Sequence, residues 1–384
     1  MKIPHFIYLI PLLTFLWGCR KDDVVIPAEY DIITETPTPG TSIKGFYLVN
    51  EGNMGSNKCT LDYFDYFTGV YSRNIYAERN PNVVKELGDV GNDVGIYGSK
   101  LYIVVNCSNK VEVLDSNSGI RIGQIDIPNC RNICFFEGKA YISSYVGPVH
   151  VDINSPKGAV YEVDTLSLAV TDRVTVGYQP EEMAIVDGYM YVANSGGYRA
   201  PEYDNTLSVI RMDDFKQVQQ ITVATNPAKV KKDKYDRLWV TAQGDRLTEP
   251  ASLYLLSKKS GQTRMSVEKK FDIPCADFAI KDDLLYYYTT REFYNNLSDG
   301  NVSYGVIDIS TLEKVTDNFI TDGTEKDIAK PYGVAIHPET GDILLTDAKN
   351  YVSSGTLYCF DKEGKKKWSV RTGDIPAHIC FLTK

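Results

Sequence analysis

The sequence predicts an all-β protein, a seven-bladed β-propeller of four-stranded antiparallel blades over residues 45–384, with the ring closed by the C-terminal strand. Three observations predict this fold. A short apolar–aromatic segment recurs about every 50 residues, and self-similarity at such a period is typical of propellers. The segments between these copies alternate apolar and polar residues, as half-buried strands do. No long stretch has the periodicity of an amphipathic helix.

The recurring segment is predicted to be the second strand of each blade. Each copy places apolar residues around an aromatic or aliphatic anchor and is followed by a polar loop. The even recurrence of the anchors along the chain indicates packing positions in the core rather than contacts to a ligand. The anchors are Tyr47, Tyr102, Tyr141, Tyr191, Trp239, Tyr286 and Leu344.

The other strands follow from the same register. Residues 132–136 precede their anchor and are expected as an inner strand, whereas residues 111–115 follow theirs and end in an Asp that starts a turn. Residues 121–127 are expected as an outer strand. The first unit has no inner strand before Phe46, and residues 378–382 supply it from the other end of the chain. Joining both ends of the domain in one blade removes an exposed sheet edge.

Residues 1–18 are expected to be a lipoprotein signal peptide. Lys2 precedes an apolar run over residues 6–17, which is too short to span a bilayer, where about 20 residues are needed. A run of this length fits the hydrophobic region of a secretory signal. It ends in Leu16-Trp17-Gly18-Cys19, which resembles a bacterial lipoprotein box and predicts cleavage before Cys19 and lipidation of its thiol.

Residues 19–44 are expected to be the lipidated Cys and a flexible tether. Arg20-Lys21-Asp22-Asp23 resembles the signal that exports lipoproteins of Bacteroidetes to the outer face of the outer membrane. The remainder is rich in Pro and Thr and has no apolar periodicity. As a flexible coil this segment would reach about 25–30 Å, enough to hold a domain clear of the membrane.

Composition and charge exclude several classes of function. The chain has 41 Lys and Arg against 50 Asp and Glu, and a net charge of −9 argues against a nucleic-acid binder, which needs clustered cations. Four His supply a multi-histidine metal site poorly, and no Cys-x-x-Cys, His-Glu-x-x-His or phosphate-loop motif is present. No catalytic residue, resident cofactor or metal is therefore expected. Cys107 and Cys130 flank one blade and could form a disulfide.

Long loops are expected on one face of the ring. In a propeller blade the turns between strands 1 and 2 and between strands 3 and 4 share one face, and the other two connections share the opposite face. The first group is short, as at residues 97–99, whereas the loops between strands 2 and 3 are long, as at residues 145–158 and 290–302. Extra loop length costs entropy, so its concentration on one face predicts a binding surface.

The predicted site consists of aromatic, amide and cationic side chains of the long-loop face. A Tyr offers a broad apolar face and a hydroxyl at little entropic cost, which suits a large amide-decorated ligand or a sugar. Two arginines could meet a phosphate. The candidate ligand-binding residues are Asn53, Met54, Tyr145, Gln179, Asn194, Tyr198, Tyr203, Gln243, Arg246, Arg291, Phe293, Tyr294, Asn350 and Tyr351.

Two segments resemble known families of surface propellers. Tyr191-Val192-Ala193-Asn194 is similar to the Tyr-Val-Thr-Asn repeat of surface-associated bacterial propellers. Tyr47-Leu48-Val49-Asn50-Glu51-Gly52-Asn53-Met54-Gly55, with the lipoprotein box and the acidic tag, resembles the BtuG family. Its members are surface lipoproteins of Bacteroidetes that capture cobalamin and pass it to a TonB-dependent outer-membrane transporter. The resemblance implies cobalamin or another corrinoid as the transported ligand, that transporter as a partner, and an outer-membrane location facing the cell exterior.

Two other functions stay open at the level of the sequence. The same Tyr-rich loops would suit a glycan- or protein-binding surface propeller. A metal-dependent propeller lactonase or lyase would need ligands at the central channel. Such ligands would suit a hard cation, and the candidates that end second strands or begin their loops are Glu51, Asn106, Asn194 and Asp347. The favoured hypothesis is non-enzymatic capture of a corrinoid over the channel.

Overall fold

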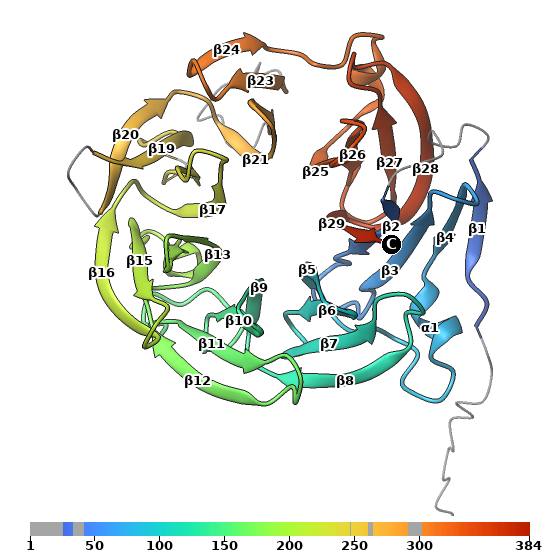
Figure 1. The fold of residues 1–384 in the computed structure, drawn as a ribbon, viewed down its shortest axis with the longest axis horizontal. Coiled ribbons are helices and arrows are strands. Elements are labelled where there is room, and N and C mark those ends of the chain that lie inside the picture. The colour runs from blue at the N-terminus through green and yellow to red at the C-terminus, as the bar shows by residue number, and fades with distance from the viewer. Residues whose placement is uncertain (1–25, 34–41, 246, 260–263, 291–301) are drawn as a thin grey trace, which may run out of the picture.

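The fold is a ring of seven β-sheets around a central channel (Figure 1). The structure is a computed structural model that describes residues 26–33, 42–245, 247–259, 264–290 and 302–384. Six sheets have four antiparallel strands, and the sheet that contains both ends of the domain has five. The predicted seven-bladed β-propeller is therefore confirmed. Among the described residues, no helix is long and apolar enough to cross a membrane.

Each blade places its strands in chain order from the channel outwards, except the first, whose inner strand comes from the C-terminus. Blade 1 contains β29 (Pro376–Thr383), β2 (Ile43–Asn50), β3 (Thr60–Asp65), β4 (Val70–Arg73) and β1 (Glu29–Ile32). Blade 2 contains β5 (Gly91–Tyr97), β6 (Lys100–Val105), β7 (Lys110–Asp115) and β8 (Arg121–Asp126). Blade 3 contains β9 (Cys130–Phe136), β10 (Lys139–Ser144), β11 (Ala159–Asp164) and β12 (Val170–Thr175).

Blades 4 to 7 repeat the same order. Their strands are β13 (Pro180–Val186), β14 (Tyr189–Asn194), β15 (Thr206–Arg211) and β16 (Lys216–Thr222); β17 (Pro227–Lys232), β18 (Leu238–Ala242), β19 (Ser252–Lys258) and β20 (Met265–Phe271); β21 (Cys275–Lys281), β22 (Leu284–Thr289), β23 (Tyr304–Asp308) and β24 (Glu313–Thr316); and β25 (Pro331–Ile336), β26 (Ile343–Asp347), β27 (Ser354–Phe360) and β28 (Lys366–Asp374). The short helices are α1 (Ile75–Arg79), η1 (Gly197–Arg199) and η3 (Thr324–Asp327).

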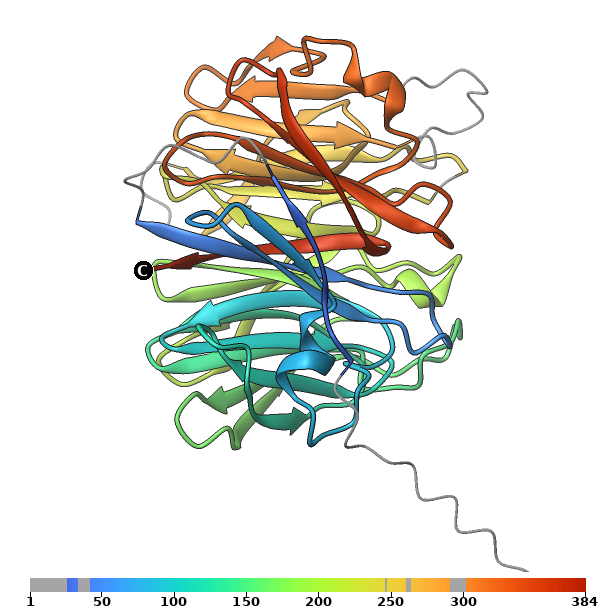
Figure 2. The same cartoon turned by 90° about the vertical axis from the view of Figure 1, so that its right-hand side faces the viewer.

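The C-terminal strand closes the ring, as the sequence predicts. β29 pairs antiparallel with β2, so that Phe46 lies opposite Phe381 and Leu48 lies opposite Ile379. Figure 2 shows the two ends of the domain side by side in this blade. Backbone hydrogen bonds between the first and last strands therefore hold the ring shut, and β2 presents no unpaired inner edge.

Part of the segment expected to be a tether belongs to the first blade. β1 pairs antiparallel with β4 from Glu29 opposite Arg73 to Ile32 opposite Val70. Arg73 also forms ion pairs with Glu29 and Asp31. The pattern of residues 29–32 did not reveal this strand because its side chains are largely exposed, and backbone bonds together with one arginine hold it.

The anchor side chains pack between neighbouring blades. Each of the seven is at most 8% exposed. Tyr47 packs with Leu101 of the next blade, and its hydroxyl donates a 2.9 Å hydrogen bond to the carbonyl of Ser116 there. Tyr191 of blade 4 packs likewise with Val240 of blade 5. The anchors therefore bind the blades to one another, which confirms that they are core residues.

The cysteines of the described residues are all free. The suggested disulfide between Cys107 and Cys130 is therefore absent. Cys130 is buried, and its thiol donates to the carbonyl of Lys110 at 3.3 Å. Burial raises the pKa of Cys130 to about 12, so this thiol stays protonated and packs as a small apolar side chain.

Candidate binding site at the mouth of the central channel

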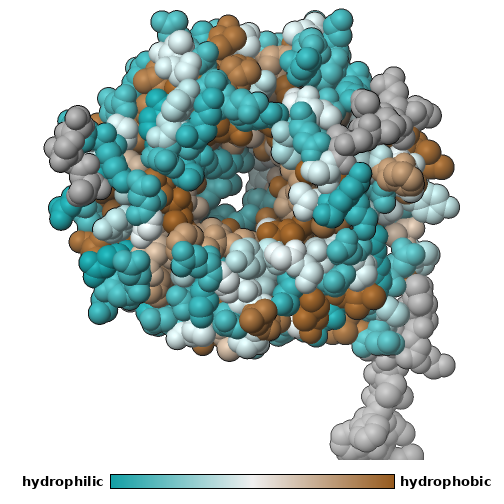
Figure 3. Space-filling model, viewed as in Figure 1, coloured by the Kyte–Doolittle hydropathy of each residue, from teal (hydrophilic) through white to brown (hydrophobic). Residues whose placement is uncertain are grey.

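The long loops lie on the face where the inner strands begin, and the channel opens there into a cavity of about 320 Å³. Figure 3 shows the opening at the centre of the ring. All seven blades contribute to its wall. We call this cavity the channel mouth; its lining residues are Glu51, Val90, Asn92, Arg131, Asn132, Glu181, Ala228, Lys229, Gln243, Ala276, Asp277, Tyr288, Thr290, Pro331, Tyr332, Tyr351, Ala377 and His378.

Each inner strand carries a register shift against its second strand where it enters from the mouth. A β-bulge places an extra residue on one strand and turns its side chains away from the regular alternation. The bulges therefore present consecutive side chains to the cavity, which a regular strand would not. The extra residues fall at positions 92, 131–132, 181–182, 228–229, 276, 332–333 and 377.

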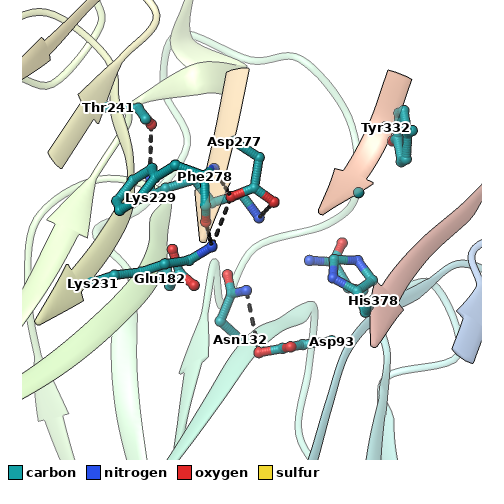
Figure 4. A network of polar contacts seen from close by, with 12 residues as sticks. Asp93, Asn132, Glu182, Lys229, Lys231, Thr241, Asp277, Phe278, Tyr332 and His378 are labelled. Atoms are coloured by element: carbon teal, nitrogen blue, oxygen red, sulfur yellow. Dashed lines mark hydrogen bonds and ion pairs between the residues drawn. The ribbon is translucent and has the colours of Figure 1, made fainter. Parts of the chain in front are cut away.

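Hydroxyl side chains of the second strands satisfy backbone groups that the bulges leave unpaired. The N–H of Lys229 donates to Thr241 Oγ1 at 3.0 Å (Figure 4), and the N–H of Gly333 donates to Thr346 Oγ1 at 2.8 Å. In blade 3 the N–H of Asn132 donates to Ser143 Oγ at 3.0 Å. These hydroxyls stand one residue before the last paired position of their strands, so the chain repeats the same solution in three blades.

A second repeated contact fixes where the long loops begin. In five blades of the described chain, the residue before the inner strand has a positive φ, and its carbonyl accepts the N–H of the first loop residue after the second strand. Two of these contacts position loop residues that line the mouth. Ile375 receives the N–H of Glu51 at 2.8 Å, and Asn226 receives that of Gln243 at 2.8 Å. Backbone geometry therefore holds both loop residues over the channel.

A half-buried ionic cluster occupies one side of the mouth. Lys231 Nζ lies 2.8 Å from Asp277 Oδ1, and Lys229 Nζ lies 3.9 Å from Asp277 Oδ2 (Figure 4). Burial alone would raise the pKa of Asp277, but the two ammonium groups lower it below its ordinary value. Burial alone would lower the pKa of Lys229, and Asp277 together with Glu182 raises it. Asp277, Lys229 and Lys231 therefore stay charged at neutral pH.

Two further acids link neighbouring blades. Asp93 Oδ2 accepts the N–H of Ile133 at 2.9 Å, and Glu182 Oε2 accepts the N–H of Val230 at 2.9 Å. Burial raises the pKa of Glu182, against the opposing effect of the nearby lysines. Both carboxyl groups use the backbone of the next inner strand as a partner, so they support the ring beneath the mouth.

Arg131 is fixed by an acid and an aromatic ring. Its Nε lies 3.1 Å from Glu181 Oε2, and its guanidinium lies over the ring of Tyr145 at 4.8 Å from the centroid. Tyr145 also donates its hydroxyl to Glu181, and Tyr198 packs edge to face on Tyr145. Burial raises the pKa of Tyr145 well above its ordinary value, so the phenol stays a donor. This group presents a rigid cationic and aromatic wall.

On the opposite side, Glu51 holds two side chains of other strands. Tyr332 donates its hydroxyl to Glu51 Oε2 at 2.8 Å, and His378 Nε2 lies 3.1 Å from Glu51 Oε1. Tyr332 meets Tyr351 edge to face, with ring centroids 5.7 Å apart. Burial and the Glu51 carboxylate raise the pKa of Tyr332, so its hydroxyl stays protonated.

Five of the predicted site residues lie in or beside the mouth. Gln243 and Tyr351 line it directly. Tyr145 and Tyr198 support Arg131 from behind, and Tyr145 itself is only 3% exposed. Asn53 donates its amide to the carbonyl of Tyr351 and so braces that loop.

The remaining predicted residues lie farther out, inside a blade or outside the described part of the chain. Met54 and Tyr203 lie in the surrounding loops, where Met54 is exposed and Tyr203 is half-buried. The side-chain oxygen of Asn350 accepts the N–H groups of Val352 and Ser353, which shapes an exposed turn. The residues outside the described chain are Arg246, Arg291, Phe293 and Tyr294.

Asn194 and Gln179 are buried in blade 4, which corrects the expectation that they face a ligand. Asn194 is 0% exposed, and its amide donates to Thr206 and Ser208 at 3.0 Å each. Gln179 is 1% exposed, and its carbonyl accepts the N–H of Ser195. The amide of Asn194 is therefore used inside the blade, whereas Oε1 of Gln179 is buried without a hydrogen-bond partner among the described residues.

The four residues suggested as metal ligands are not brought together. Asn106 donates to Asn129 and to the carbonyl of Cys130, and Asp347 accepts the backbone N–H groups of Lys330, before β25, and Lys349, after β26. Asn194 is buried, and Glu51 alone of the four lines the mouth. Within the described residues no group of three or more His, Cys, Asp or Glu side chains is arranged to hold a metal ion.

The charged residues of the mouth were missed because the site was sought in loops. Arg131, Glu181, Lys229 and Asp277 belong to inner strands, where the pattern predicts apolar core. One signal could have found three of them, since Arg131, Glu181 and Lys229 each stand ten residues before the anchor of their blade. A polar residue at this fixed position of a buried strand indicates a bulge facing the channel.

The comparison with protein families decides which family the chain belongs to. The model of the family described as "Domain of unknown function (DUF5074)" matches residues 44–381, which is the propeller apart from β1, the first residue of β2 and the last three residues of the chain. The chain belongs to the DUF5074 family. No curated protein matches the sequence of this DUF5074 chain.

Solved structures similar to this DUF5074 propeller share its fold at low identity. A quinonprotein alcohol dehydrogenase-like protein of Bacteroides thetaiotaomicron is 12% identical, with a TM-score of 0.61 over 89% of this chain and 79% of that one. The periplasmic gluconolactonase of Pseudomonas aeruginosa is 12% identical, with a TM-score of 0.60 over 88% and 99%. A putative 6-phosphogluconolactonase of Bacteroides fragilis is 11% identical, with a TM-score of 0.61 over 90% and 100%. These likenesses concern the propeller fold alone.

Proposed function

We propose that this protein is a non-catalytic capture protein that binds a corrinoid across the channel mouth. The observation that carries the proposal is the preorganised surface of the mouth. Its charged side chains are held in pairs, and tyrosines and amides stand around them. A surface already fixed in this way loses little conformational entropy on binding, which favours tight association.

A corrinoid matches the chemistry of this surface. Its macrocycle is broad and carries carboxamide groups at its edge, and these can exchange hydrogen bonds with Asn92, Asn132 and Gln243 of the mouth. Tyr332 and Tyr351 offer apolar ring faces to the macrocycle. A corrinoid is larger than the 320 Å³ cavity, so it would cover the mouth and touch the surrounding loops.

The proposal includes the cellular setting that the N-terminus suggests. Lipidation at Cys19 and the segment up to residue 44 would anchor the propeller to the outer membrane, facing the cell exterior. A TonB-dependent transporter would then receive the captured ligand. The support for this setting is the signal-like run, the lipoprotein box and the acidic tag of the sequence.

Calorimetric titration of the purified protein with cyanocobalamin tests the proposed function. We expect one site with nanomolar or tighter affinity. The double variant Gln243→Ala/Tyr351→Ala should bind at least tenfold more weakly, because it removes an amide and a ring from the mouth. Lys362→Ala, in an exposed turn on the opposite face, is the control and should bind like the native protein. Absence of heat and of co-migration on gel filtration would contradict capture.

A second candidate, hydrolysis of a sugar lactone, is favoured by the contact between Glu51 and His378. An imidazole oriented by a carboxylate can act as a general base toward water. Acid release from a gluconolactone, followed with a pH indicator, tests this candidate. Turnover that His378→Ala abolishes, in a protein that gives no heat with cyanocobalamin, would replace capture by hydrolysis.

A further inference from the structure

His378 is the side chain of the mouth with the most specific chemistry that the proposed function leaves unused. It lies on β29 directly after a bulge, and its side chain is 16% exposed. Among the described residues that line the mouth, it supplies the one imidazole. The other two described histidines stand elsewhere: His150 lies in an exposed loop and His337 is buried.

The hydrogen bonds around Glu51 define the tautomer of His378. Tyr332 donates to Glu51 Oε2, so that oxygen is an acceptor, and Glu51 Oε1 faces His378 Nε2 at 3.1 Å. A carboxylate that accepts this hydrogen bond requires the tautomer with the proton on Nε2. Nδ1 of the neutral ring then holds a lone pair, and within the described residues it has no hydrogen-bond partner.

This arrangement is the one that proteins use to prepare an imidazole for a metal. A carboxylate that accepts the N–H of one ring nitrogen orients the ring and raises the basicity of the other nitrogen. Neutral imidazole is also the commonest metal ligand among side chains. Here the Tyr332 hydroxyl in turn holds the Glu51 carboxylate. Tyr332 of β25 and Glu51 of the loop after β2 therefore position the imidazole of His378 on β29.

The mouth is open enough for a metal centre carried by a ligand to approach. The bulge positions of blades 5, 6 and 1 are occupied by Ala228, Ala276 and Ala377, whose methyl groups leave the cavity wide. Ala377 is the residue directly before His378.

We propose that Nδ1 of His378 coordinates the cobalt(III) of a bound corrinoid as an axial ligand. The inference rests on the proposed function. In aquocobalamin the exchange breaks one Co–O bond to water and forms one Co–N bond; the water leaves, the ligand lone pair supplies both electrons and no redox change occurs. Glu51 is a positioning residue in this step, because it acts through the imidazole.

The visible absorption of aquocobalamin tests the inference, because replacing bound water by an imidazole shifts the bands of the corrin. Addition of the native protein should shift them, and aquocobalamin should dissociate at least tenfold more slowly than cyanocobalamin, whose cyanide blocks the exchange. His378→Ala should bind aquocobalamin without the shift and should release both ligands at similar rates. Glu51→Gln should keep a weaker shift that forms more slowly.

Controls separate this inference from the proposed function and from misfolding. His150→Ala removes an exposed histidine and should leave the shift intact. His378→Gln keeps a hydrogen-bond donor toward Glu51 but has no imidazole, so it should also bind aquocobalamin without the shift. It replaces His378→Ala as the test variant if truncation of the side chain disturbs β29. Heat of binding without a His378-dependent shift would overturn the coordination and leave capture standing. No binding of either cobalamin would overturn both.

Discussion

Charged side chains at the channel mouth have partners that belong to other blades. Asp277 of blade 6 faces Lys229 and Lys231 of blade 5, and Glu51 of blade 1 faces Tyr332 of blade 7. Removing one partner from a buried group of charges costs more than the pair contributes, because the others stay desolvated and uncompensated. The side chains of the mouth therefore stabilise the ring as well as presenting a surface to a ligand.

Asp277→Asn should lower the free energy of unfolding by about 2 kcal/mol, below the 3–5 kcal/mol of a fully buried pair, because these side chains stay partly exposed. Urea unfolding measures the loss. Asp283→Asn removes the partner of Lys234 in a more exposed pair and should lower the free energy of unfolding by much less. Equal losses in both variants would show that the cluster around Asp277 stabilises the fold no more than an exposed ion pair does.

The same cluster predicts a pH dependence. The lysines lower the pKa of Asp277 in the folded protein below its unfolded value of about 3.9. A lowered carboxyl pKa adds stability above the unfolded pKa, and this stability is lost as the pH falls through the folded pKa. The difference between native protein and Asp277→Asn should therefore be full above about pH 5 and shrink toward pH 2. Urea midpoints across this range measure it, and a constant difference would contradict the assignment.

At the scale of the elements, the bulges of the inner strands determine which residues reach the cavity. The anchors and strands could be predicted because each is a short segment with strong alternation, repeated at a fixed period. The bulges could not, since a local pattern does not show that two strands lose register. Arg131 and Lys229 therefore looked like ordinary strand residues, and only the three-dimensional register places them in the mouth.

The hydroxyls behind the bulges provide a test at this scale. Thr241→Val removes the acceptor of the Lys229 N–H with little change in shape, and an unsatisfied buried donor costs about 1–3 kcal/mol. Thr175→Val changes an exposed threonine of the outer strand β12 and should alter the unfolding free energy by less than about 0.5 kcal/mol. Chemical denaturation compares the two; similar small effects would mean that the bulge N–H finds another partner.

At the scale of the whole molecule, the prediction of one closed ring was confirmed, whereas the predicted contacts to a ligand stay a prediction. The long loops lie on the face that carries the mouth, and Gln243 and Tyr351 line it. Loop position alone could not separate exposed side chains from Asn194, which the blade buries. The strand β1 was also hidden, because backbone pairing rather than an apolar pattern holds residues 29–32.

Ring closure leads to a prediction about the intact domain. Deletion of residues 375–384 removes all of β29, leaves the inner edge of β2 unpaired and should produce an aggregating protein without a cooperative thermal transition. Deletion of the residues up to 32 removes the exposed outer strand β1, keeps the buried Ile33 and should leave a monomer with a similar transition. Gel filtration and calorimetry compare the two, and a monomeric, cooperative C-terminal deletion would contradict closure by β29.

The central claim is that the ligand binds over the channel mouth, and calorimetric titration of a blocked mouth tests it most directly. Ala276→Trp places a large ring at the bulge of blade 6, whereas Lys362→Trp adds the same ring to a turn on the opposite face. With both variants folded, the account predicts that Ala276→Trp binds cyanocobalamin at least a hundredfold more weakly and that Lys362→Trp keeps the native affinity. Native affinity in Ala276→Trp would contradict the account.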